Sequence, residues 1–245
     1  MTLLARREMT LQIHPAGLGA AVQAGVIMSL AATVGLGAIG WATGVAFGVL
    51  AWSVLAEGIR RSGARSWGPA DTITLVRLAL TGGVAALVAE ALTGRTMLMT
   101  LVGLAAVAAA LDAVDGQVAR RTKTTSAFGA RFDMEADSVL VLILSLFVAS
   151  SLGWWVAAIG LFRYAFVAAS WAWPWLRGSL PPRMVRKVVA ALQGAVLVLA
   201  SADLVPVWQA QIVVALALGF LTWSFGTDVV WLRSRRTLAT SGGNL

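Results

Sequence analysis

The chain of 245 residues is 59% hydrophobic and only 12% charged, and its mean hydropathy is +0.83. This composition excludes an ordinary soluble domain and a disordered chain, and the recurring apolar runs predict an all-α integral membrane protein. In such a protein the formal net charge of +8 indicates cytoplasmic loops and anionic headgroups rather than a nucleic-acid partner. The absence of Cys excludes disulfides and thiolate metal sites.

In chain order, residues 1–58 are predicted to form a mixed tail followed by a two-helix membrane hairpin. The apolar spans of the hairpin are 16–36 and 39–55. Gly40, Gly44 and Gly48 recur every four residues in the second span, a spacing that allows close helix contact. Residues 59–68 form a basic linker, 69–232 the main membrane domain, and 233–245 a basic tail that we expect to be disordered. We expect a bundle of about eight transmembrane helices, six of them in the main domain.

The main domain opens at residues 69–77, where Asp71 or Thr72 is expected to cap a helix. The next two spans are predicted at 97–120 and 130–151. They carry four of the eleven acidic residues: Asp112, Asp115, Asp133 and Asp137. Spacings of three and four place each pair on one helix face, and the turn between the helices could bring all four together. Because a carboxylate costs about 2.5–3.5 kcal/mol at the centre of a membrane helix, four converging ones predict one or two divalent cations such as Mg²⁺, Mn²⁺ or Ca²⁺.

The complete spacing, D-x2-D-G-x2-A-R-x8-G-x3-D-x3-D, resembles the signature of the CDP-alcohol phosphotransferase family, integral membrane enzymes of phospholipid synthesis. The resemblance covers roughly residues 69–193. It implies that the four Asp hold Mg²⁺ or Mn²⁺, expected as two ions, and that Asp137 also acts as the general base. It places a further group of residues near the nucleotide and diphosphate of the donor, namely Asp71, Thr74, Arg77, Gly116, Ala119, Arg120, Ser126 and Gly129.

Further spans are predicted at 154–173, from 186, and at 207–232, and Asp228 is expected at the interface. Arg163 is an isolated cation in an apolar helix, which indicates either function or a structural ion pair. Residues 186–193 are similar to the family element G-K-x-x-T-x-x-Q, with Arg and Ala in place of Gly and Thr. The candidates for acceptor binding are Arg163, Arg183, Arg186, Lys187 and Gln193. Several cations favour a phosphorylated acceptor over serine, although the residues before 186 could equally form a positive-inside loop.

Together with these cations, the resemblance implies an enzyme that transfers a phosphatidyl group from CDP-diacylglycerol to a small phosphorylated alcohol, such as glycerol 3-phosphate or inositol phosphate, and releases CMP. A family member using serine, another unphosphorylated alcohol or another CDP-linked donor stays open, as does an inactive relative. A cation- or proton-coupled transporter would instead spread its acids across the membrane depth. The positive-inside rule predicts cytoplasmic termini and a cytoplasmic active site in the cell membrane. The resemblance also implies a homodimer.

Overall fold

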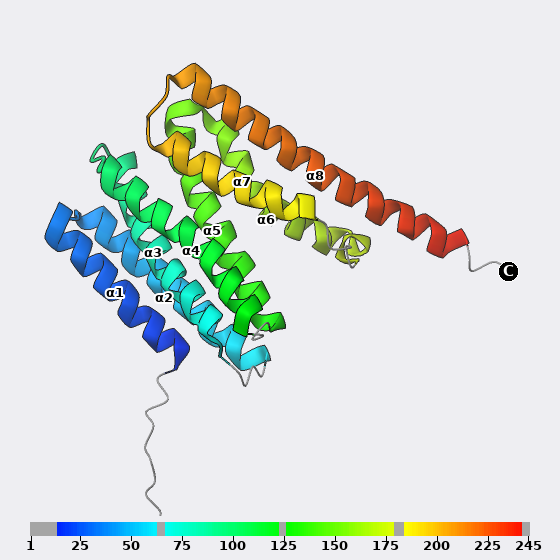
Figure 1. Ribbon diagram of the computed structural model, residues 1–245, viewed down its shortest axis with the longest axis horizontal. Helices are drawn as coiled ribbons and strands as arrows, with labels where there is room; N and C mark the ends of the chain where they lie inside the picture. Colours follow the sequence, from blue (N-terminus) through cyan, green and yellow to red (C-terminus); the bar gives the residue numbers. More distant parts are fainter. Residues whose placement is uncertain (1–13, 63–66, 123–125, 179–183, 242–245) are drawn as a thin grey trace, which may run out of the picture.

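The computed structural model describes residues 14–62, 67–122, 126–178 and 184–241. Within these residues it contains eight α-helices and two short 3₁₀ helices and has no strand (Figure 1). The α-helices are α1 (Pro15–Val34), α2 (Ala38–Ser62), α3 (Pro69–Leu92), α4 (Leu98–Thr122), α5 (Ala127–Leu152), α6 (Ala157–Ala172), α7 (Met184–Ser201) and α8 (Val207–Ser241). The 3₁₀ helices η1 (Trp154–Val156) and η2 (Pro174–Arg177) flank α6.

Seven helices of the described part are long and apolar enough to cross a membrane, with η1 and α6 counted as one span. The exception is α7, whose apolar part, Val188–Ser201, is shorter. The prediction of an all-α membrane protein is therefore confirmed. At the other end of the chain, α8 stays helical to Ser241, where the sequence predicts a tail without structure from residue 233. Residues 242–245 of that predicted tail lie outside the described part.

The predicted N-terminal hairpin is formed by α1 and α2. Helix α1 ends at Gly35, which takes the left-handed conformation (φ 71°) common at helix C-termini. Where the two helices pack, a methyl group on Gly44 would lie 2.6 Å from the side chain of Ile27, and one on Gly48 would lie 3.1 Å from that of Gln23. The glycine spacing thus allows the close contact that the sequence predicts.

The centre of this half of the bundle is α3, which is buried along most of its length and packs against α1, α2, α4 and α5 (Figure 1). Small residues make this possible. A methyl group on Gly82 would lie 2.5 Å from Gln23 of α1, and one on Gly83 would lie 2.8 Å from Leu104 of α4. Membrane helices associate through such close packing because lipid supplies no hydrophobic force between them.

The buried carboxylate of Glu90 joins the hairpin to the end of α3. It accepts a hydrogen bond of 2.8 Å from the backbone N–H of Gly40 and pairs with Arg95 at 3.4 Å. Arg95 in turn donates to the carbonyl of Gly35, at 3.0 Å. A carboxylate near the N-terminus of α2 is favoured by the free N–H groups there. Beyond α3, α5 leads to the other half of the bundle, packing against α6 and α7, and α7 packs against α8.

Candidate active site

Asp71 lies in the first turn of α3 and its side chain bonds back to the start of the helix, but Asp71 is not the N-cap residue. Gly68 is the N-cap, and Asp71, three residues later, accepts a 2.8 Å hydrogen bond from the Gly68 N–H. The prediction that Asp71 or Thr72 caps the helix is therefore wrong, because the chain already enters its helical path at Pro69. Asp71 is buried, and a methyl group on Gly129 of α5 would overlap its carboxylate. Gly129 thus allows α5 to approach α3.

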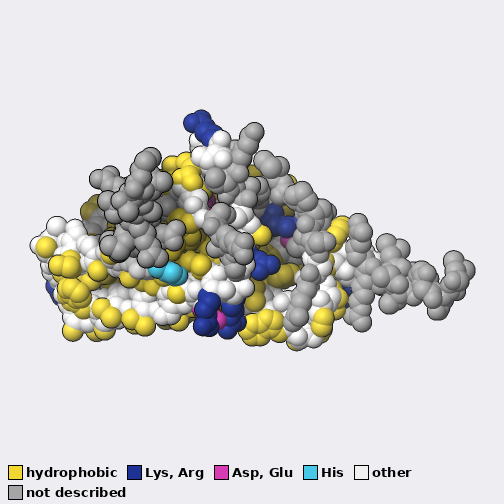
Figure 2. Space-filling model, turned by 90° about the horizontal axis from the view of Figure 1, so that it is seen from below, with side chains coloured by type: hydrophobic (Ala, Val, Ile, Leu, Met, Phe, Trp, Pro, Cys, Tyr) yellow, Lys and Arg dark blue, Asp and Glu magenta, His cyan; other side chains and the backbone are white. Residues whose placement is uncertain are grey.

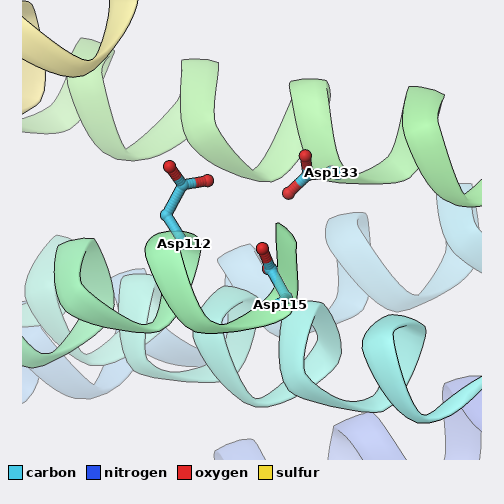
Figure 3. A group of neighbouring side chains, drawn as sticks. All are labelled: Asp112, Asp115 and Asp133. Carbon is cyan, nitrogen blue, oxygen red and sulfur yellow. The ribbon is translucent and has the colours of Figure 1, made fainter. Parts of the chain in front are cut away.

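Three of the four motif carboxylates form one group, which we call the Asp triad: Asp112 and Asp115 on α4 and Asp133 on α5. One oxygen from each lies within 4.8 Å of the others. Figure 3 shows the two α4 side chains facing Asp133 across the space between the helices. The side chain of Asp115 is 4% exposed, whereas those of Asp112 and Asp133 are 39% and 41% exposed. The triad therefore has a closed side at Asp115 and an open side from which a substrate can approach.

Arg77 of α3 has a fully buried side chain and reaches all three members of the triad. Its Nη1 pairs with Asp112 and lies 3.8 Å from Asp115, while its Nη2 pairs with Asp133 and donates to the Asp133 carbonyl at 3.0 Å. Thr74, one turn earlier, donates a hydrogen bond of 3.1 Å to Asp115. The sequence assigned both residues to the donor nucleotide. In the structure both residues bond to carboxylates of the triad, so α3 meets α4 and α5 there.

Asp137 lies one turn after Asp133 on α5 and does not belong to the triad. Its carboxylate is close enough to interact electrostatically with Asp112, Asp133, Arg77 and Arg163. The sequence predicted a cluster of four carboxylates. The structure brings three together and leaves the fourth beside them.

A family model for CDP-alcohol phosphatidyltransferase matches residues 67–223, more than half of the chain. The chain belongs to this family. The match begins just before α3 and ends within α8, so it contains the triad, Arg77 and Asp137 and leaves the α1–α2 hairpin outside. Searches among curated proteins and among solved structures find no match. The protein is accordingly a membrane enzyme of phospholipid synthesis with CDP-alcohol phosphatidyltransferase activity.

The donor set of this phosphatidyltransferase fits a divalent metal ion. Three carboxylates and one guanidinium leave a formal charge of −2 at the triad (three negative, one positive). Hard carboxylate oxygens suit Mg²⁺, Mn²⁺ or Ca²⁺. Arg77 balances part of the negative charge, and a divalent ion would balance the remainder. The structure therefore supports a metal site at Asp112, Asp115 and Asp133, consistent with a metal-dependent family.

Other residues that the sequence assigned to the phosphatidyltransferase site have varied positions. The Ser126 hydroxyl caps α5 and accepts a 2.8 Å hydrogen bond from the Gly129 N–H. Gly116 follows Asp115 on α4 and is partly buried. The side chains of Ala119, Arg120 and Lys187 lie outside the described part, as does the whole of Arg183.

The candidate acceptor residues with described side chains all contact neighbouring helices. Arg163 pairs with Glu135 of α5, and Arg186 bonds the carboxylate of Asp228 at 3.0 Å. The Gln193 amide donates to the carbonyl of Ala217 on α8, at 2.8 Å. Asp228 is buried against the neighbouring helices and lies near the end of the last apolar span. The sequence did not reveal that Glu135 pairs with Arg163 or that Asp228 pairs with Arg186. Each acid lies far along the chain from its arginine, so no local pattern links the two.

Proposed function

We propose that this phosphatidyltransferase moves the phosphatidyl group of CDP-diacylglycerol to the hydroxyl of a small phosphorylated alcohol, such as glycerol 3-phosphate or inositol phosphate, and releases CMP. The observation that carries the proposal is the Asp triad, held by Arg77 at the junction of α3, α4 and α5 inside the family match. Its partly exposed side gives a diphosphate access to the carboxylates.

The metal would be held by Asp112, Asp115 and Asp133, and when bound it would neutralise charge on the donor diphosphate. We assign Mg²⁺ or Mn²⁺, as two ions: one would balance the charge left at the triad, and the second would balance charge on the donor diphosphate. Asp137 stands beside the triad, so in this proposal it accepts the proton of the acceptor hydroxyl as general base. The hydroxyl oxygen bonds to the phosphorus that carries diacylglycerol, and the bond from that phosphorus to the cytidine phosphate breaks, which yields CMP and a phospholipid.

We assign donor contacts to the α4 segment after the triad. Gly116 and Ala119 carry little or no side chain, so a nucleotide can approach this helix closely. Arg120 would bind phosphate oxygens through two parallel N–H groups. The first turns of α3 and α5, where Gly129 lies close to both Asp71 and Ser126, would form the adjoining wall.

A phosphorylated acceptor is supported by the position of Arg163. This cation is close enough to Asp137 to interact with it electrostatically, and its present partner, Glu135, is 57% exposed and therefore free to turn away. A phosphate dianion pairs strongly with a guanidinium, whereas serine offers no such group. Arg183, Arg186, Lys187 and Gln193 stay in the proposal as further acceptor contacts.

The decisive experiment is an acceptor screen with purified protein, CDP-diacylglycerol and Mg²⁺ or Mn²⁺, in which CMP release and the mass of the lipid product are measured. Glycerol 3-phosphate or inositol phosphate should be used, and free serine should not. Arg163→Ala should raise the KM for the acceptor much more than that for the donor, because ground-state binding is lost there. Efficient use of serine, or equal effects on both substrates, would refute the assignment of the acceptor.

The roles of the carboxylates are tested separately. Asp112→Asn, Asp115→Asn and Asp133→Asn should each lower the rate by orders of magnitude, as should excess chelator. Asp137→Asn should still bind the donor but fail to transfer, and a normal rate would exclude it as the base. Asp203→Asn, in the exposed turn after α7, is the matched control and should be fully active.

We further propose that both termini and the active site face the cytoplasm and that the enzyme is a homodimer. Reporter fusions after Arg61 and after Arg121 should report the same, cytoplasmic side, and opposite sides would refute this topology. Mass measurement in a mild detergent that finds only the monomer would count against the dimer.

A further inference from the structure

The hairpin outside the family match carries a groove that the phosphatidyltransferase site does not explain. This hairpin groove has a volume of about 720 Å³ and runs between α1 and α2. Its lining is almost wholly apolar and includes the small residues Gly17, Ala20 and Ala24 of α1 and Gly44 and Gly48 of α2. The volume falls within the range of roughly 300–1,000 Å³ that is typical of ligand sites.

A second hollow, which we call the polar pocket, adjoins the hairpin groove at one end. It has a volume of about 500 Å³ and is lined by His14, Ser53, Ala56, Glu57, Ile59 and Arg60. Ser53 and Ala56 line both hollows, so the two adjoin at these residues. Figure 2 looks onto this end of the bundle and shows the one histidine in cyan, with basic and acidic side chains on the same face. An apolar groove beside a polar pocket matches a molecule with an apolar chain and a polar head.

The charge at the polar pocket favours an anion. Arg60 and Arg61 share one carboxylate, that of Glu57, at 2.6 Å and 2.5 Å. Arg60 lines the polar pocket and Arg61 does not, so the one carboxylate at the pocket is shared with a guanidinium outside it and does not fully balance the charge of Arg60. The Arg60 side chain is 79% exposed and can therefore turn toward a phosphate bound in the pocket.

The length of the hairpin groove matches one leaflet of a membrane. It extends along α1 from Ala16 to Met28, twelve residues apart, or about 18 Å at 1.5 Å per residue. The hydrocarbon core of a bilayer is about 30 Å thick, so one leaflet is about half of that. The basic residues at the polar pocket are suited to the headgroup region, and the groove then runs inward to about the midplane.

We propose that the hairpin binds one anionic membrane phospholipid, with an acyl chain in the hairpin groove and the phosphate in the polar pocket beside Arg60. The bound lipid lies on the same side of the bundle as the Asp triad. A methyl group on Gly58 of α2 would lie 3.4 Å from Phe128, in the first turn of α5, and the triad member Asp133 lies only five residues further along that helix. This site is separate from the catalytic residues and does not depend on which acceptor the enzyme uses.

The first test uses two glycines of α1. A methyl group built on Gly17 or on Gly25 has no atom within 4 Å, so both Gly17→Leu and Gly25→Leu should fold. Only Gly17 lines the hairpin groove. The full chain in detergent is titrated with 1-palmitoyl-2-oleoyl phosphatidylglycerol and bound lipid is counted by native mass spectrometry. Gly17→Leu should bind about tenfold more weakly than wild type, because its side chain takes the place of the acyl chain. Gly25→Leu should bind like wild type.

The second test uses the two arginines that share Glu57. Arg60→Gln should abolish the preference for phosphatidylglycerol over phosphatidylcholine, because it removes the guanidinium that lines the polar pocket. Arg61→Gln removes a guanidinium outside the pocket and should keep most of the preference. Unchanged binding in Gly17→Leu, equal losses in both glycine variants, or equal losses of preference in both arginine variants would overturn the proposal. A change of oligomeric mass in Gly17→Leu with unchanged lipid binding would also overturn it and would assign the groove to a second copy of the chain.

Discussion

Replacing Arg77 by Met removes the only cation that the structure places inside the Asp triad among the described side chains. One carboxylate oxygen from each member of the triad lies within 4.8 Å of the others. At an effective dielectric constant of about 20, each such pair of charges repels by about 3.5 kcal/mol. In the wild type the attraction of the three carboxylates to the fully buried guanidinium opposes this repulsion.

Removing one partner of a buried ion pair usually costs about 3–5 kcal/mol. We expect Arg77→Met to fall at the lower end of this range, since Asp112 and Asp133 are partly exposed and water screens their charges. For a chain of this size that corresponds to a fall in Tm of roughly 10 °C. The measurement is thermal unfolding of the purified protein in detergent with excess chelator.

The same experiment with Mg²⁺ tests the cause. A cation bound at the triad replaces part of the lost positive charge, so Mg²⁺ should raise the Tm of Arg77→Met by more than that of the wild type. Arg163→Met is the matched control, because its pair with Glu135 is partly exposed and lies outside the triad. Equal stability of wild type and Arg77→Met in chelator, or an equal response of both to Mg²⁺, would refute this account of the triad.

Two further predictions concern the helix contacts that support the site. Gly160→Ala should destabilise the protein by about 1–3 kcal/mol, because its methyl group would lie 2.5 Å from the backbone of Leu142 on α5. Gly219→Ala, with no atom within 4 Å, should unfold at the wild-type temperature, and equal losses in both would contradict the packing argument. Glu90→Gln should cost about 1–3 kcal/mol, since a buried carboxylate loses its charge beside Arg95 and the Gly40 N–H. Glu57→Gln, at the surface, should cost less than about 1 kcal/mol, and a larger loss there than in Glu90→Gln would refute the assigned role of Glu90.

Much of the fold was predictable because membrane helices depend on local properties of the chain. A run of apolar residues must satisfy its own backbone hydrogen bonds in lipid, so length and hydropathy alone indicate each helix. The predicted spans at 97–120 and 130–151 correspond to α4 and α5 with shifts of only a few residues. The glycines at every fourth residue of α2 likewise predicted close packing with α1.

The sequence by itself also indicated where carboxylates meet, although it included Asp137 in the cluster and the structure does not. Spacings of three and four residues fix which side chains share a helix face, so the motif placed Asp112, Asp115 and Asp133 at one junction. Only the tertiary structure decided their partners. Arg77 occupies the triad, Asp137 stands outside it, and Arg163 pairs with Glu135, because the rotation of α3, α5 and α6 about their own axes selects these contacts. That rotation depends on packing between helices distant in sequence, and no local spacing records it.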